Sequence, residues 1–173
     1  MDFLKLEDLF GDMVEMILQD DIPRKNIRMT YPTGGQPSWG IDENVVFVRL
    51  FEKEDEYTKQ LDNTYEVENE TIVKKSTRTR VWELQLVAYG PIANNIVNKI
   101  KDGVFRQEIK NLLTKSNVFL IPNMPMCKRI PELFGEQWWN RWDITLNFNE
   151  LYKLADEDVG RIETVGIQTN INQ

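Results

Sequence analysis

The sequence predicts an α+β fold, in which a mainly antiparallel β-sheet is flanked by helices. Strand-like segments follow one another with few helical crossovers, in the expected order α, β, β, α, α, β, β, β. Glycine and proline residues mark the ends of most of these segments. The chain has 173 residues, of which 41% are hydrophobic. This length and composition predict one domain over residues 1–173 with its own hydrophobic core.

The first part of the chain predicts one helix, a connector and a strand. Residues 2–19 carry an apolar side chain at every third or fourth position, which predicts an amphipathic helix with Asp2 as its N-cap. Glycine and proline crowd residues 22–43, so an irregular connector is expected there. The β-branched and aromatic residues of 45–51 predict a strand. The chain then becomes polar and acidic, and we expect a projecting acidic loop or hairpin at about 52–76.

A long strand followed by two helices is predicted next. Residues 71–89 form the strand, with alternating side chains on its two faces. One face carries Trp82, Leu84, Leu86 and Ala88, and the other carries Val81, Glu83, Gln85, Val87 and Tyr89. Gly90 ends the strand, and Pro91 fits the first position of a helix that stops at Gly103. The apolar stripes of this helix and of a second one over 104–114 contain Ile92, Ile96, Ile100, Phe105, Ile109, Leu112 and Leu113.

The last third predicts three more strands. Residues 117–121 form a short apolar strand, which a proline-rich loop follows. Residues 139–148 form the next strand, and its core face contains Trp142, Ile144, Leu146 and Phe148. A short polar helical turn is expected near 149–157, and a final strand is expected over 160–169.

The amino-acid composition excludes most enzymatic chemistry. The chain has no histidine, and Cys127 is its one cysteine, which excludes Ser-His-Asp and Cys-His catalysis, cysteine zinc sites and an internal disulfide. We therefore predict no catalytic residue, cofactor or metal. Carboxylate–magnesium chemistry is the remaining alternative, with Asp156, Glu157 and Asp158 as candidates. A net charge of −7 argues against a protein that binds nucleic acid through surplus lysine and arginine.

No segment predicts a membrane protein or a secreted one. Apolar runs stay well short of the ~20 residues that a membrane helix needs. The N-terminus carries Asp2, Lys5, Glu7 and Asp8, which does not fit a signal peptide. We expect a protein made in a cytosol.

The charge pattern between residues 52 and 80 leaves two alternatives. An acidic block that includes Glu54, Asp55, Glu66 and Glu68 precedes a basic group formed by Lys74, Lys75, Arg78 and Arg80. In the first alternative, the two arms of one hairpin neutralise each other across their ladder. In the second, the acidic arm of one copy meets the basic strand of the next, and this head-to-tail contact repeats until a ring closes.

Three tryptophans crowd a short span at the start of the predicted strand 139–148. Trp142 belongs to the core face of that strand. Trp138 and Trp139 are adjacent, so in an extended segment they cannot both point into one core. One alternative makes them anchors of a protein interface, which is a common role of tryptophan. The other places one of them in a second core layer under the helices.

Three motifs carry a resemblance to a known family. They are Tyr-Pro-Thr-Gly-Gly-Gln-Pro-Ser-Trp over 31–39, Val-Trp-x-Leu-x-Leu-Val-Ala-Tyr-Gly-Pro over 81–91, and Arg-Ile-Pro-Glu-Leu-Phe-x-Glu-Gln-Trp-Trp-x-Arg-Trp-Asp over 129–143. These motifs resemble those of phage neck or tail terminator proteins of tailed bacteriophages. The third motif is the most specific, because its tryptophan spacing is unusual. The matching segments lie between residues 31 and 148.

This resemblance implies a tail-terminator-like α+β subunit that assembles as a ring, commonly of six copies. Such a ring caps the tail tube, so the implied partners are further copies of the chain, the tail tube protein and the head connector or stopper protein. DNA would pass through the lumen without specific binding. The implied location is the neck or tail of the virion, after assembly in the cytoplasm of the bacterial host. Residues 52–76 and those beyond Leu151 depart from the family pattern, so the resemblance assigns them no role.

Two other functions remain open at this point. One is a stopper or adaptor ring of the same head–tail junction. The other is a cytosolic protein-binding module that acts as a monomer or dimer. A stable particle of about six copies with a central hole would separate the ring-forming functions from the binding module.

Overall fold

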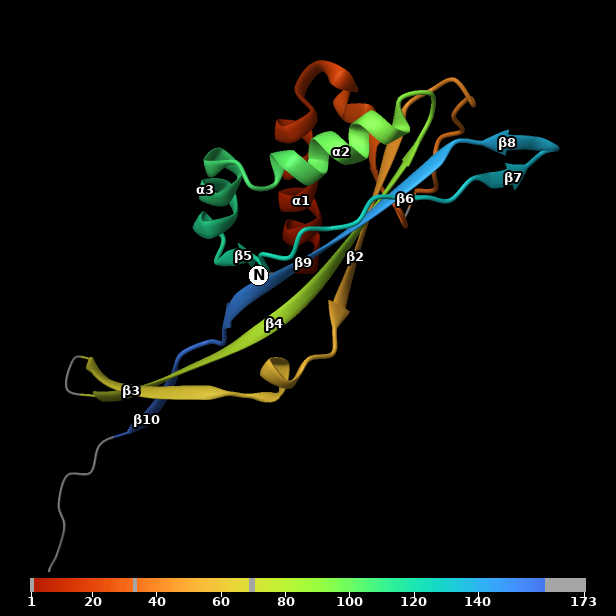
Figure 1. Ribbon diagram of the computed structural model, residues 1–173. Coiled ribbons are helices and arrows are strands. Elements are labelled where there is room, and N and C mark those ends of the chain that lie inside the picture. Colours follow the sequence, from red (N-terminus) through yellow and green to blue (C-terminus); the bar gives the residue numbers. More distant parts are fainter. Residues whose placement is uncertain (1, 33, 69–70, 161–173) are drawn as a thin grey trace, which may run out of the picture.

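The computed structural model describes residues 2–32, 34–68 and 71–160, and it confirms the α+β class with a mostly antiparallel sheet. The described residues contain three α-helices, which lie on one face of the sheet (Figure 1). The helices are α1 (Phe3–Leu18), α2 (Ala93–Gly103) and α3 (Gln107–Lys115). The strands are β1 (Ile27–Met29), β2 (Val45–Lys53), β3 (Asp62–Glu68), β4 (Thr71–Tyr89), β5 (Val118–Leu120), β6 (Lys128–Arg129), β7 (Glu132–Phe134), β8 (Gln137–Trp139), β9 (Arg141–Lys153) and β10 (Glu157–Gly160).

Strand β4 is the centre of the sheet, because it is long enough to pair with four other strands. Residues 81–89 of β4 lie between β2 and β9, both antiparallel to it. Residues 71–77 pair with β3, and residues 72–74 pair with β10. Strand β1 runs parallel to β2, while β5 and β6 pair with β9. The predicted strand 71–89 is thus confirmed and carries two different sets of neighbours along its length.

The main core lies between the helices and one face of the sheet. Side chains at even positions of β4 and β9 face this core, among them the buried Trp82 and Phe148. The ring of Phe10 from α1 lies 4.8 Å from the ring of Phe148. Helix α2 crosses α1 so closely at Gly103 that an added Cβ would lie 2.4 Å from Cγ2 of Ile17. The apolar periodicity therefore predicted the core-facing side of these elements correctly.

The turn before α2 differs from the prediction. Helix α2 begins at Ala93 and not at Pro91. Gly90 has a φ of +111°, and a Cβ there would lie 2.5 Å from Oδ1 of Asn44, so only glycine fits. Oδ1 of Asn44 also accepts a hydrogen bond of 3.1 Å from the backbone N–H of Ile92. This turn leaves Ile92 exposed, whereas the predicted helical stripe had placed it in the core.

The helical turn predicted near 149–157 is wrong, because β9 continues to Lys153. The backbone of this stretch pairs with residues 77–80 of β4, which keeps the polar segment extended. Of the strand predicted over 160–169, only Gly160 lies within the described residues, at the end of β10.

The first part of the chain differs from the expectation in its connector. The connector predicted over 22–43 contains the short strand β1, which pairs with β2 in parallel. Three residues are too few to show the alternating pattern from which a strand is predicted. Asp2 is the N-cap residue of α1, as predicted, although its side chain makes no capping hydrogen bond. Its backbone carbonyl accepts a hydrogen bond of 3.1 Å from the N–H of Leu6.

Candidate assembly surfaces

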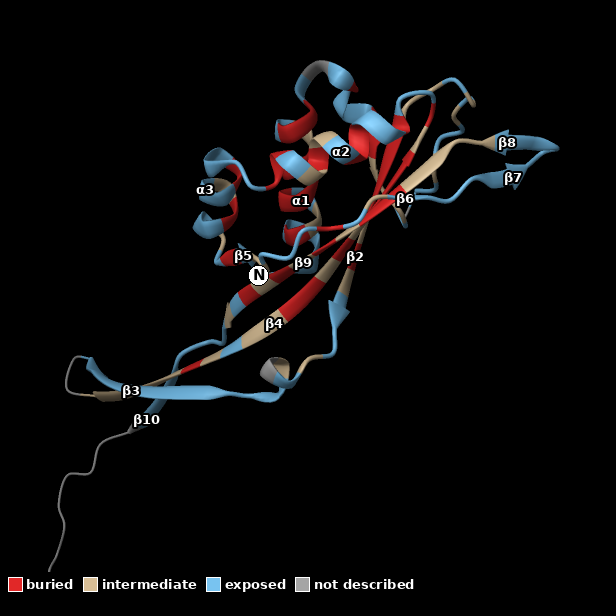
Figure 2. Ribbon diagram, in the orientation of Figure 1, coloured by how far each residue is buried: buried red, intermediate tan, exposed pale blue. Residues whose placement is uncertain are grey.

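The first candidate surface is the arm, which we define as β3, residues 71–80 of β4, and β10. The arm extends from the sheet beyond the helices (Figure 1). Every residue of β3 is exposed, while the second half of β4 is mostly buried (Figure 2). A strand of seven residues that lies at the edge of a sheet with both faces exposed is typical of a segment that contacts another chain.

Within the arm, the charged side chains pair across the strands of one chain. Nζ of Lys75 lies 2.6 Å from a carboxylate oxygen of Glu66 and 2.5 Å from one of Glu68. These hydrogen bonds raise the pKa of Lys75 above its ordinary value. Nζ of Lys74 lies 3.2 Å from Glu157 of β10. The pairing within one hairpin, the first of the two alternatives above, is therefore present for Lys75.

The two arginines of the arm lie where it joins the core. The guanidinium of Arg80 lies 4.1 Å from the ring centroid of Tyr152 and donates to the buried Glu150 at 2.8 Å. Arg78 lies 5.4 Å from the same ring. Both cations therefore sit on the side of the sheet that carries the helices. Of the acidic residues predicted with them, Glu54 lies in the loop after β2, 3.5 Å from Lys59.

The remaining predicted residue of the acidic block, Asp55, precedes a short 3-10 turn (Glu56–Lys59). Its backbone carbonyl accepts a hydrogen bond of 2.7 Å from the hydroxyl of Thr58. The structure thus gathers six of the eight predicted charged residues on the arm and leaves Glu54 and Asp55 in the loop that leads to it.

The second candidate surface is the aromatic end, which we define as the β7–β8 hairpin with Trp39 and Tyr89. It lies at the other end of the sheet from the arm (Figure 1). The ring of Trp139 lies 5.9 Å from Trp39 and 6.3 Å from Tyr89, both in edge-to-face geometry. Trp138 points away from this cluster and is 67% exposed. Because the two tryptophans are consecutive residues of β8, the strand places them on opposite faces.

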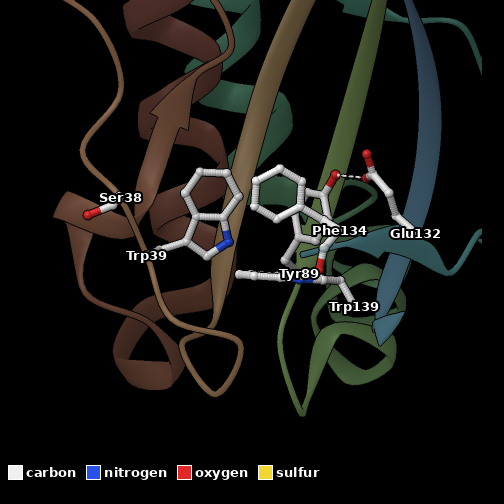
Figure 3. A pocket seen from close by; sticks show the side chains of 6 residues that line it. All are labelled: Ser38, Trp39, Tyr89, Glu132, Phe134 and Trp139. Atoms are coloured by element: carbon white, nitrogen blue, oxygen red, sulfur yellow. Dashed lines mark hydrogen bonds between the residues drawn. The ribbon is translucent and has the colours of Figure 1, made fainter. Parts of the chain in front are cut away.

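The rings of the aromatic end enclose a pocket of about 370 Å³ (Figure 3). Its walls are Ser38, Trp39, Tyr89, Glu132, Phe134 and Trp139. The indole Nε1 of Trp39 is buried and, among the described residues, has no hydrogen-bond partner. An apolar group would suit such a pocket, because most of its walls are aromatic rings.

Hydrogen bonds to Glu132 tie the hairpin to the sheet. The hydroxyl of Tyr89 donates to a carboxylate oxygen of Glu132 at 2.6 Å, and Arg141 lies 3.3 Å from the same oxygen. Burial, with the hydrogen bond to Glu132, raises the pKa of Tyr89 to about 12. The hydrogen bonds from Tyr89 and Arg141 lower the pKa of Glu132. Glu132 therefore stays ionised near neutral pH and holds the hairpin against β4.

A comparison with protein families shows which family this chain belongs to. The model of a family described as phage neck terminator protein matches residues 5–173. This chain belongs to the phage neck terminator family. The match confirms the resemblance carried by the three sequence motifs and extends it over α1 and the end of the chain, which the motifs did not cover. A search of curated proteins found no match.

The sequence did not predict that three residues of the aromatic end of this neck terminator lie together. Trp39, Tyr89 and Glu132 were not predicted as a group, because 50 and 43 residues separate them along the chain. The sequence signal was indirect: all three lie within the motifs that resemble the family. The second core layer considered for Trp138 and Trp139 was expected under the helices. The structure instead places Trp139 on the sheet face opposite the helices, next to the small buried cluster of Val45, Phe47 and Val87.

Trp142, by contrast, is half-buried and packs against the main core, as its position in the alternating pattern predicted. The structure offers the neck terminator little other chemistry. Burial raises the pKa of the Cys127 thiol, which lowers its reactivity. In the parts of the chain that the structure describes, no three acidic, cysteine or histidine side chains gather to hold a metal ion. The helices of these parts are also too short or too polar to cross a membrane.

Proposed function

We propose that this neck terminator is a non-enzymatic building block whose copies form a ring of about six at the head end of the tail tube. The ring would stop growth of the tube and present a surface to the head connector. The observation that carries this proposal is the arm, because β3 leaves the core with every residue exposed. A monomer gains nothing from such a strand, whereas a subunit can bury it against its neighbour.

The candidate contact residues fall on the two surfaces described above. Copies would meet through the charged arm and the loop before it, which carry Glu54, Asp55, Glu66, Glu68, Lys74, Lys75, Arg78 and Arg80. The aromatic end, with Trp138 and Trp139, would contact the tube protein or the head connector. Exposed tryptophan and aromatic pockets are typical anchors of protein interfaces.

The net charge of −7 fits a ring through which DNA passes without being bound. A negatively charged lumen repels phosphates and lets the duplex slide. The proposed place of the ring is the neck of the virion, after assembly in the host cytoplasm.

Light scattering of the purified protein, combined with negative-stain imaging, tests the proposal. We expect a particle of about six copies with a central hole. If the protein alone does not form this particle, we expect it to form when tail tubes are present. Tubes should stop elongating when the protein is added. Normal tube growth in its presence, or virions with complete DNA-filled necks that lack the chain, would overturn the proposal.

A further inference from the structure

We propose that the arms of neighbouring copies stack face to face. One side of the arm continues the sheet face that the helices cover in the core, and this side of one arm meets the opposite side of the next arm. This contact rests on the ring proposed above and specifies which faces form it. The occupant of each face is therefore a second copy of this chain.

Strand alternation gives the arm two distinct faces. Even positions of β4 point to the same side as the core residue Trp82, and we call this the helix-side face. Odd positions of β4 point to the other side, which we call the open-side face. The registers assign the other strands: Tyr65 lies opposite Lys74, and Glu66 lies opposite Val73. Tyr65 is therefore on the helix-side face and Glu66 on the open-side face.

The helix-side face is basic and partly apolar. It carries three cations, Lys74, Arg78 and Arg80, and two carboxylates, Glu150 and Glu157. Arg80 and Glu150 are both largely buried and pair with each other, so the exposed charges of this face are Lys74 and Arg78 against Glu157. Tyr65 and Val67 are 62% and 76% exposed on this face. The helices that cover the same side of the sheet in the core end before the arm (Figure 1).

The open-side face is acidic. The registers place four carboxylates there, Asp62, Glu66, Glu68 and Asp158, with the two lysines Lys75 and Lys153. The pairs that Lys75 makes with Glu66 and Glu68 neutralise only part of this charge. All four carboxylate residues are exposed.

Opposite charge on two faces of one arm makes the chain complementary to itself. A contact between different faces of identical copies is heterologous, and it leaves each copy with one face free for the next until the ring closes. A tube or connector protein would need only one of these faces. Charges at the rim of such a contact select the partner and its orientation, while Tyr65 and Val67 supply apolar area.

Charge reversal tests the contact while it keeps the pairs inside each arm. The helix-side variant is Lys74→Glu with Arg78→Glu and Glu157→Lys. The open-side variant is Asp62→Lys with Glu66→Lys, Glu68→Lys and Lys75→Glu. The matched control, Lys74→Glu with Glu157→Lys, exchanges one ion pair and leaves the charge of its face unchanged. Assembly is measured by light scattering and folding by the melting curve of each variant alone.

Each variant alone presents like charges at the contact, so we expect it to lose the ring peak with an unchanged melting curve. An equimolar mixture should regain the peak, because in an alternating ring the reversed helix-side face of one variant meets the reversed open-side face of the other, and the two unreversed faces also meet. Both contacts then join faces of opposite sign. The control should assemble like the wild type. Rings from either variant alone, or no recovery in the mixture, would overturn arm stacking while the ring itself stands. A wild-type chain that forms no ring, alone or on tubes, would overturn the proposed function and the stacking together.

Discussion

The indole Nε1 of Trp82 donates a hydrogen bond of 2.8 Å to the carboxylate of Glu150, which is only 1% exposed. Arg80 donates to the same carboxylate from the next position on that face of β4. The ring of Trp82 also lies 6.0 Å from that of Phe3 in α1. This cluster marks the point where the helix-covered sheet ends and the arm begins. It fixes the direction in which the arm leaves the core.

Replacement of Glu150 by alanine should therefore cost about 3–5 kcal/mol of unfolding free energy, because Arg80 would keep a largely buried charge without its carboxylate. Urea unfolding measures the loss. Glu157→Ala is the matched control, since it removes an exposed partner of Lys74 and should cost about 0–1 kcal/mol. Equal losses of unfolding free energy in the two variants would show that the buried ion pair of Glu150 stabilises the fold no more than an exposed one.

The three neighbouring tryptophans should respond differently to alanine. Trp142→Ala removes a ring packed against the main core and should cost about 3 kcal/mol of unfolding free energy. Trp139→Ala opens the aromatic cluster and should cost roughly 1–3 kcal/mol. Trp138→Ala should leave the melting curve unchanged and weaken assembly with neck partners, because this side chain is exposed. A stability loss for Trp138→Ala as large as for Trp142→Ala would contradict its assignment to a surface.

The contact between Tyr89 and Glu132 should show in alkaline titration. The pKa of Tyr89 is raised from 10 to about 12 in the folded chain, so its hydroxyl stays protonated there while the unfolded chain ionises. The stability linked to this group is present below pH 10 and is lost as the pH rises towards 12. Tyrosinate absorbance should contain one late-titrating group that Tyr89→Phe removes. A titration curve of Tyr89→Phe with that late group still present would contradict the prediction.

The close crossing of α1 and α2 gives a packing test. Gly103→Ala places a Cβ 2.4 Å from Cγ2 of Ile17 and should cost about 1–3 kcal/mol of unfolding free energy through overpacking. Gly34→Ala is the control, because a Cβ at that position meets no atom within 4 Å. Its melting curve should match or slightly exceed that of the wild type. Similar losses in both variants would mean that the helices do not cross as described.

Elements with a local signal could be predicted from the amino-acid sequence alone. Periodic apolar residues predicted α1, and alternation predicted β4 with Trp82 on its core face, because burial of one face leaves a regular spacing in the chain. The absence of histidine and the three motifs also pointed to a structural protein of the phage neck before any coordinates.

Contacts between residues that are far apart in the chain could not be predicted and came from the folded structure. The polar stretch after Phe148 looked like a turn, yet pairing with β4 keeps it extended as far as Lys153. Trp39 and Trp139 form one cluster although 100 residues separate them. The face on which each β3 side chain lies depends on the register between β3 and β4, and a shift of one residue would move all of them to the opposite face. In a hairpin this register follows from the turn and the loop length, and the polar, acidic composition of residues 52–70 did not show where the turn lies.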